Sequence, residues 1–291
     1  MGRSVALVGD SSGKYPSGNS LMVLGTEEVV LIDPSLAVQA RGGPPESVDR
    51  ILVSHAHEDH VVGLASFPEA RVHAHEDDLL GIRSLEGFMT IYGMPSDIAL
   101  DWQAEVVTQF HYSPREDATG FVDGQRFDVG GSRIEVVHLP GHTRGHCGFL
   151  IEPDGVFFVA DIDLSSFGPY YGDHWSDLED FERAIQRCRG IEARHYVTFH
   201  HKGVVSDRTE FLTALEQFRA VIDTREARLL AFLAEPRTMT EMVSHRIIYR
   251  PDTKLLFLDH VEKTSIAMHL RRMVRTGAVT EFEPGWYRTA A

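Results

Sequence analysis

Three imidazoles and two carboxylates lie within six consecutive residues of this 291-residue sequence, in the stretch HAHEDH at residues 55–60. The stretch directly follows the apolar residues 51–53, which favour a strand. Side chains spaced in this way cannot all lie on one face of a helix or strand, but they can converge from a loop. Imidazole nitrogens and carboxylate oxygens are ligands for divalent cations, so the stretch predicts a metal site.

A site for two ions needs ligands from other parts of the chain, because one loop supplies at most four. Three later stretches qualify, namely GHTRGH at 141–146, ADID at 160–163 and HHKG at 200–203. Each follows a short run rich in β-branched and aromatic residues, which favours a strand that ends at the polar motif. The sequence therefore predicts that several strand ends meet at one metal centre.

These four motifs, in this order, resemble the metallo-β-lactamase superfamily, and the first matches the family's H-x-H-x-D-H pattern in full. The stretch KYPSGNSLMVLGTEEVVLIDPS at 14–35 also resembles the family's first hairpin, which ends in an Asp near the metals. The resemblance covers about residues 5–205. It implies an α/β protein whose catalytic part is an αββα sandwich with the metals at the sheet edges.

The resemblance also implies a ligand set for two divalent ions, most simply zinc, with iron or manganese also compatible with His and carboxylate ligands. The first ion would be held by His55, His57 and His142, the second by Asp59, His60 and His201, and Asp161 would bridge them. His201 is preferred to its neighbour His200 because the family's late ligand commonly precedes a short turn containing Gly. Asp163 competes with Asp161, which directly follows the strand expected at 156–160.

Six further residues are candidates for supporting the metals or contacting substrate: Asp33, His146, His200, Tyr170, Tyr171 and Trp175. Asp33 would either orient a ligand histidine or only end a strand. His146 would either support the metal site or only fix the conformation of its own loop. The aromatic residues that follow Asp161 would form a substrate wall or pack beneath the next helix.

Two cations about 3.5 to 4 Å apart lower the pKa of a bound water and polarise the oxygen under attack, so hydrolysis is the expected chemistry. Asp59 could also act as a catalytic group that takes up a proton. The favoured function is a dinuclear hydrolase that uses metal-bound hydroxide on a small ester, thioester or lactone. The alternatives are an endoribonuclease or phosphodiesterase for single-stranded RNA, an iron-dependent sulfur dioxygenase, and a binder that has lost catalysis.

Residues 1–210 are predicted to form the catalytic domain, in which 77–117 could be a helical flap over the metals. Residues 211–291 are predicted to form a helical, winged-helix-like module, with helices at 211–222, 226–233, 238–243 and 264–274 before two short strands. This layout resembles the β-lactamase-like protein 2 group. Arg271, Arg272 and Arg275 gather on one helix and would allow nucleic-acid contact, but packing on the catalytic domain or on a second subunit of a homodimer is favoured.

The amino-acid composition of the chain argues against several classes of binding partner and location. The formal charge of −15 disfavours a protein that coats nucleic acid, because that task requires clustered Lys and Arg. Cys147 and Cys188 are too few for a disulfide framework. There is neither an apolar signal segment nor a run of about 18 apolar residues. We therefore expect a cytoplasmic protein with a small-molecule substrate and no membrane anchor.

Overall fold

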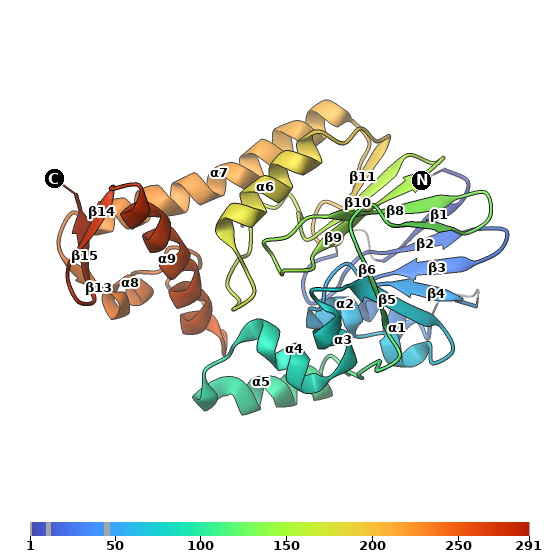
Figure 1. Ribbon diagram of the computed structural model, residues 1–291, viewed down its shortest axis with the longest axis horizontal. Coiled ribbons are helices and arrows are strands. Elements are labelled where there is room, and N and C mark those ends of the chain that lie inside the picture. Colours follow the sequence, from blue (N-terminus) through green and yellow to red (C-terminus); the bar gives the residue numbers. More distant parts are fainter. Residues whose placement is uncertain (1, 10–12, 44–46, 291) are drawn as a thin grey trace.

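The computed structural model describes residues 2–9, 13–43 and 47–290. Two six-stranded sheets pack against each other, and helices cover their outer faces (Figure 1). The first sheet has the order β1 (Val5–Val8), β2 (Ser20–Leu24), β3 (Val29–Ile32), β4 (Arg50–Leu52), β5 (Arg71–His75) and β6 (Thr119–Phe121). The second has the order β12 (Val204–Val205), β11 (His195–Thr198), β10 (Val156–Ala160), β9 (Cys147–Glu152), β8 (Arg133–His138) and β7 (Arg126–Asp128).

The core between the sheets consists of alternate residues of both, such as Val23 and Ile32 of the first and Val136, Phe149 and Phe158 of the second. Each of these side chains is at least nine-tenths buried, as expected for facing sheets whose strands alternate inward and outward positions. Because helices then cover both outer faces, the predicted αββα sandwich is confirmed.

Helices form the two outer layers. Those over the first sheet are α1 (Leu36–Ala40), α2 (Glu58–Val61), α3 (Leu79–Arg83), α4 (Leu85–Tyr92) and α5 (Ser96–Thr108). Those over the second sheet are α6 (Leu178–Arg189) and the first half of α7 (Arg208–Phe232). Helix α6 begins at the Asp177 side chain, which accepts hydrogen bonds from the backbone N–H groups of Glu179 and Asp180.

The strand directions explain why the polar motifs meet. Strands β3, β4, β5 and β6 run parallel, and β10 runs parallel to β11. Strand β8 runs antiparallel to β9, which is antiparallel to β10, so β8 and β10 end at the same edge of their sheet. The segments after β3, β4, β8, β10 and β11 carry the motifs, and the sheets thus bring them to one rim.

The Glu28 carboxylate connects three strands at the opposite rim of the first sheet, and its pKa gives a prediction about how stability depends on pH. Its carboxylate accepts hydrogen bonds from Arg50 at 2.9 and 3.1 Å and from Arg71 at 2.7 Å, linking the starts of β3, β4 and β5. These hydrogen bonds lower its pKa from 4.5 to about 2. A depressed carboxyl pKa stabilises the folded state above about pH 4.5, and this contribution is lost as the pH falls towards 2.

We therefore expect Glu28→Gln to cost about 1 to 2 kcal/mol of unfolding free energy at pH 7 and much less near pH 2.5. Urea titrations of both proteins at the two pH values measure the difference. Glu27→Gln, whose carboxylate makes none of these contacts, is the matched control. An equal loss at both pH values would contradict the prediction.

The C-terminal part shows one clear departure from the sequence prediction. The helices expected at 211–222 and 226–233 form a single helix, α7, of 25 residues. No Gly or Pro interrupts residues 223–225, and Arg225 is held inside by hydrogen bonds to the carbonyls of Phe167 and Pro169. The first half of α7 packs on the second sheet, whereas its last turns pack on the C-terminal helices. The helix therefore spans the boundary predicted at residue 210.

The remaining elements are β13 (Arg237–Thr238), α8 (Met239–His245), α9 (Leu258–Arg275), β14 (Val279–Glu283) and β15 (Trp286–Thr289). Thr238 and Glu241 form a capping box at the start of α8. Helix α9 begins six residues before the predicted start at 264. The three strands form a small sheet in the order β13, β15, β14. Its relation to winged-helix modules stays a prediction. Within the described chain, no helix has the length and apolar character needed to cross a bilayer.

Candidate metal centre

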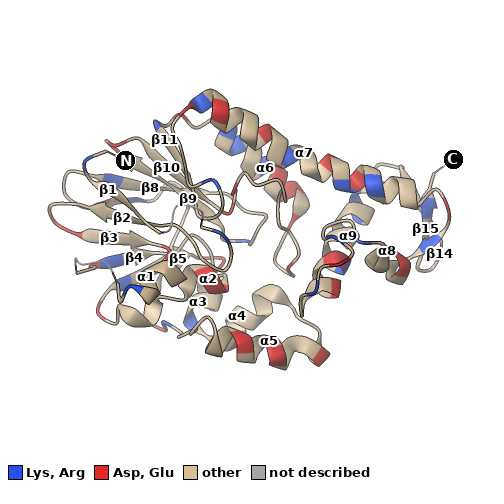
Figure 2. Ribbon diagram, turned by 180° about the vertical axis from the view of Figure 1, so that it is seen from behind, with Lys and Arg blue, Asp and Glu red and all other residues tan. Residues whose placement is uncertain are grey.

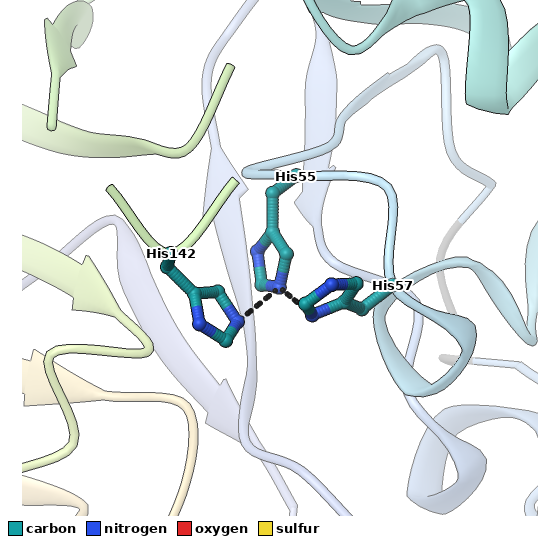
Figure 3. A group of neighbouring side chains, drawn as sticks. All are labelled: His55, His57 and His142. Atoms are coloured by element: carbon teal, nitrogen blue, oxygen red, sulfur yellow. Dashed lines mark hydrogen bonds between the residues drawn. The ribbon is translucent and has the colours of Figure 1, made fainter. Parts of the chain in front are cut away.

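Three histidines converge on one point from the loops after β4 and β8 (Figure 3). His55 Nε2 lies 3.1 Å from His57 Nδ1 and 3.1 Å from His142 Nε2. Ligands of a tetrahedral zinc ion with bonds of about 2.0 to 2.1 Å lie about 3.3 Å apart. The spacing of the three nitrogens therefore suits one shared ion, in line with the ligand set implied by the first and second motifs.

The other ring nitrogens of these histidines are held by the surrounding protein. His142 Nδ1 donates to the Tyr170 carbonyl at 2.9 Å, and His57 Nε2 lies 3.0 Å from a carboxylate oxygen of Asp173. His55 Nδ1 lies 3.0 Å from the Ser54 hydroxyl. Such contacts fix both the ring orientation and the tautomer, so each imidazole presents a free nitrogen to the common point.

A second group consists of Asp59, His60 and His200. His200 Nε2 lies 2.9 Å from Asp59 Oδ2, and His60 Nε2 lies 3.8 Å from Asp59 Oδ1. Asp33 orients His60, because its carboxylate accepts a hydrogen bond from His60 Nδ1 at 2.9 Å. The same carboxylate accepts two hydrogen bonds of 2.6 Å from Ser54, as expected for a residue that supports the ligands.

Asp161 lies between the two groups. One carboxylate oxygen is 3.0 Å from His60 Nε2, and the other is 3.3 Å from His142 Nε2. This is the position that a bridging ligand requires. Its competitor Asp163 instead faces His201, which lies outside both groups.

The geometry does not support the preference for His201 as the late ligand. His201 has a positive φ of 58° and a side chain that is 40% exposed, with Nε2 3.6 Å from Asp163. His200 is buried, and its Nδ1 donates to the Gly13 carbonyl at 2.7 Å, which turns Nε2 towards Asp59. The geometry therefore favours His200 over His201 as the late ligand.

Backbone strain accompanies the site. Asp33, Ala160 and His201 all have a positive φ, between 46° and 58°, in a region that residues with a side chain rarely adopt. All three follow or end strands that lead to the metal groups. Such strain is maintained where the surrounding structure enforces it, commonly at functional sites.

His146 contacts the backbone of Asp161. Its Nδ1 donates to the Leu139 carbonyl at 2.8 Å, and its Nε2 accepts the backbone N–H of Asp161 at 3.2 Å. Burial and the neighbouring His142 lower the pKa of His146 to about 3, so the ring is neutral and can accept. The ring therefore makes the contacts expected of both predicted roles of His146. It supports the backbone of Asp161, and it fixes the conformation of its own loop.

Several polar atoms of the site, including His60 Nε2, Asp59 Oδ2 and Asp161 Oδ1, are buried and lie close to one another or to His200 without the geometry of a hydrogen bond among the described residues. Leaving such atoms without partners is costly. At His55, burial and the imidazoles of His60 and His57 hold the pKa well below its ordinary value, which keeps this ring neutral. At His60 and His200, by contrast, the carboxylates of Asp161 and Asp59 outweigh burial and raise the pKa. Clustered imidazole nitrogens and carboxylate oxygens that lack hydrogen bonds are what divalent cations require, so the residues present fit two such ions.

A cavity of about 280 Å³ lies over the two groups. The helical segment predicted as a flap contributes to its wall through Tyr92, Met94 and Trp102. A further part of the wall comes from the segment between α8 and α9, which the sequence did not indicate. The two groups and Asp161 contribute to the wall through His57, Asp59, His142, Asp161 and His200.

Of the three aromatic residues proposed as a substrate wall, only Tyr170 lines this cavity. Tyr171 points towards the C-terminal helices, where its hydroxyl lies 3.0 Å from Nε2 of His269. Trp175 lies beneath the Arg144 guanidinium at 4.7 Å and packs in the core of the first sheet. Of the two predicted roles, Tyr171 and Trp175 thus have packing in the core rather than a place in the substrate wall.

Sequence reasoning missed two aspartates that organise the first group. Asp173 contacts His57. Asp78 joins the first two motifs, because its carboxylate accepts hydrogen bonds from residues of both, namely Ala56, Thr143 and Gly145. No local pattern in the sequence distinguishes either aspartate from the many others of the chain.

Sequence reasoning also passed over Glu58, although it lies within the first motif. Its buried carboxylate receives hydrogen bonds from the hydroxyls of Tyr15, at 2.9 Å, and Tyr92. Its place in the sequence between the candidate ligands His57 and Asp59 is the signal that could have found it.

Asp173 gives a direct prediction. Replacing it by Asn removes the charge that holds His57 Nε2 while keeping the size of the side chain. Residues that support ligands in this way typically contribute a factor of about 10 to 100 to metal affinity. We expect a loss of that size for Asp173→Asn, measured by competition with a chromophoric chelator. The exposed Asp128→Asn is the control, and an unchanged affinity for Asp173→Asn would refute the supporting role.

Comparisons with known proteins agree with this geometry. The family model described as metallo-beta-lactamase superfamily matches residues 14–220. An atrochrysone carboxyl ACP thioesterase of Aspergillus fumigatus is 25% identical over 205 residues, covering 66% of this chain and 52% of that protein. A beta-lactamase-like protein 2 homolog of Caenorhabditis elegans is 22% identical over 232 residues, covering 80% of this chain and 67% of that protein. This chain thus spans only about half the length of the thioesterase.

Among solved structures, a metallo-beta-lactamase family protein from Thermus thermophilus is similar over 98% of both chains, with 25% identity and a TM-score of 0.72. A beta-lactamase domain protein from Burkholderia ambifaria has the same TM-score at 16% identity and covers all of this chain and 93% of that one. The similarity thus extends through the C-terminal elements. With the matched family model, the αββα sandwich and the converging histidines and aspartates, the chain belongs to the metallo-beta-lactamase superfamily.

Proposed function

We propose that this protein is a hydrolase that uses two divalent metal ions, most simply zinc, to cleave a small ester, thioester or lactone. The observation that carries the proposal is the position of Asp161 between two ligand groups, one of three histidines and one of Asp59, His60 and His200. Seven side chains from the segments after β4, β8, β10 and β11 thus converge, and their donor atoms suit zinc, with iron or manganese as alternatives.

Divalent ions bound there would supply a nucleophile derived from water near neutral pH and would polarise the carbonyl oxygen of the substrate. The chain's own residues have distinct tasks. Asp33 and Asp173 hold His60 and His57 in position, and His146 holds the backbone of Asp161. Asp59 lies on the cavity wall, where its carboxylate can accept a proton from the attacking water and return it to the leaving group.

The names of relatives support cleavage of an acyl bond. Besides the fungal thioesterase, a hydroxyacylglutathione hydrolase of Methylococcus capsulatus is 25% identical over 138 residues, covering 45% of this chain and 52% of that protein. Both names describe hydrolysis of an acyl compound. Neither relative is matched over its full length, so they support the reaction class rather than a particular substrate.

Action on RNA is less well supported by the charges. Two of the three arginines considered for nucleic-acid contact are engaged within the chain. Arg272 pairs with Glu182 at 2.6 Å and with Glu226, and Arg275 pairs with Glu179. Helix α9 therefore turns these residues towards α6 and α7, in line with packing on the catalytic domain.

The test begins with metal analysis of the purified chain, followed by chelation and reloading with zinc, manganese or iron. We expect about two ions per chain and hydrolysis of esters, thioesters or lactones that disappears on chelation and returns on reloading. Bis-aryl phosphodiester and single-stranded RNA substrates are assayed in parallel. Fewer than one ion per chain, or no acyl hydrolysis in any reloaded sample, would overturn the proposal. One iron per chain with oxygen consumption would favour the dioxygenase alternative.

A further inference from the structure

We infer that the cavity over the metal-binding groups takes an uncharged, apolar acyl group, and that the segment between α8 and α9 limits the size of that group. The inference deepens the proposed function and rests on it, because an acyl group is assigned to the cavity only if acyl bonds are cleaved there. It assigns a role in substrate selection to residues 249–257 of the C-terminal part.

The first argument is the chemistry of the wall away from the metal groups. Aromatic and apolar side chains supply it, among them Met94 and Trp102 of the flap, Phe167, and Phe257. Trp102 is buried and meets the Phe257 ring edge to face, with centroids 5.4 Å apart. An apolar wall of this kind stabilises a bound alkyl or aryl group by removing its surface from water.

The second argument is charge. The described residues that line the cavity include five carboxylates and neither Lys nor Arg. Asp59 belongs to the second group and Asp161 lies between the two groups, and each of the other three has a partner among the cavity's own His and Tyr residues. Helix α5, which belongs to the flap, carries acidic residues without a basic one (Figure 2). An anionic acyl group would therefore be buried without a cation beyond the metals, which is unfavourable.

The third argument concerns the segment between α8 and α9, which contributes Tyr249, Leu255 and Phe257 to the wall. Its start is fixed by the buried Glu262 of α9, whose carboxylate accepts hydrogen bonds from the backbone N–H groups of residues 247, 248 and 249 at 2.8 to 3.3 Å. Its end is fixed by His260, whose Nε2 donates to the Tyr92 carbonyl of the flap at 2.9 Å. Both ends of the segment are therefore held in place at the cavity wall by hydrogen bonds.

The size of the cavity sets a limit. Sites for drug-sized ligands usually enclose about 300 to 1,000 Å³, so a cavity of about 280 Å³ suits a short acyl chain or a single ring. Phe257 and Leu255, together with Tyr249, line the cavity from the C-terminal part. Removing either side chain would lengthen the space available to the acyl group.

The test compares aryl esters that differ only in the acyl group. Matched substrates are a neutral pentanoyl ester and the glutaryl ester of similar length that ends in a carboxylate. We expect kcat/KM to favour the neutral ester by about 100-fold or more. In a series of linear acyl chains, we expect Phe257→Ala and Leu255→Ala to move the preferred length up by about two carbon atoms. Leu256→Ala, an exposed neighbour outside the cavity, is the control.

Binding provides a readout that does not need turnover. Calorimetric titration of the metal-loaded protein with neutral and anionic amide analogues of the same two acyl groups should show the same preference. Binding of the neutral amide without ester hydrolysis would refute the proposed function but keep the apolar cavity. Hydrolysis with preference for the glutaryl ester would overturn the inference. Because Leu255 is partly exposed and its replacement is expected to leave the fold intact, an unchanged length preference in both variants would also overturn it.

Discussion

Asp59→Asn is expected to lower kcat/KM for acyl hydrolysis by about 10³-fold or more. The buried carboxylate lies 2.9 Å from His200 Nε2 and faces the cavity, so it is placed to act both as a metal ligand and as a proton acceptor. The amide of Asn keeps the size of the side chain but cannot take up the proton. Steady-state kinetics with an aryl ester, together with metal analysis, measure the effect.

The matched control is Asp77→Asn, which alters a carboxylate that is 56% exposed and lies outside the cavity. Its activity should stay within about twofold of the parent protein, because exposed substitutions away from a site have small effects. A variant Asp59→Asn that retains two ions and more than a tenth of the activity would contradict the role given to Asp59.

The adjacent histidines provide the second prediction. We expect His200→Ala to lose one of the two metal ions and to reduce activity by about 10² to 10³-fold, because the second group then retains only two of its three members. His201→Ala should keep both ions and most of the activity, since His201 lies outside both groups. Metal content per chain after dialysis against a weak chelator measures the difference directly.

Because His200 is buried and His201 is partly exposed, thermal unfolding of both variants shows whether a lost ion reflects a change in the fold. Loss of the ion in His201→Ala, with retention in His200→Ala, would restore the assignment made from the sequence. Loss in both variants would show that the turn at 198–203, rather than one imidazole, holds the second ion.

Much of the metal centre follows from the sequence because its parts are local. The motif at 55–60 places four candidate ligands in one loop, and strand ends at one rim bring the other motifs to it. The sequence favours His201 and the geometry favours His200, and the difference has a physical reason. Because side chains alternate along a strand, only one of the two histidines can point inward. The left-handed backbone of His201 and the hydrogen bond from His200 to Gly13 determine which one does, and these depend on distant chain segments.

The same limit applies to the fold. Local patterns predicted the strands that precede the polar motifs and the helices at 238–243 and 264–274, because these elements depend on nearby residues. They did not predict that α7 is continuous, because helix length here follows from packing on two separate cores. Nor did they place the segment between α8 and α9 beside the metals, since the hydrogen bond that fixes its end, from His260 to Tyr92, joins residues 168 positions apart.

The contact of Tyr171 with α9 has a consequence for how the two parts of the chain depend on each other. Tyr171 lies in the same short segment as Tyr170 and Asp173, which hold two imidazoles of the first group. Ser265 donates to the Tyr171 carbonyl, and Gly172 packs so closely on Val261 that an added Cβ would lie 2.3 Å from its Cγ1. Helix α9 thus holds in place the segment that orients two imidazoles of the first group, so we expect changes in the C-terminal part to alter the positions of these imidazoles.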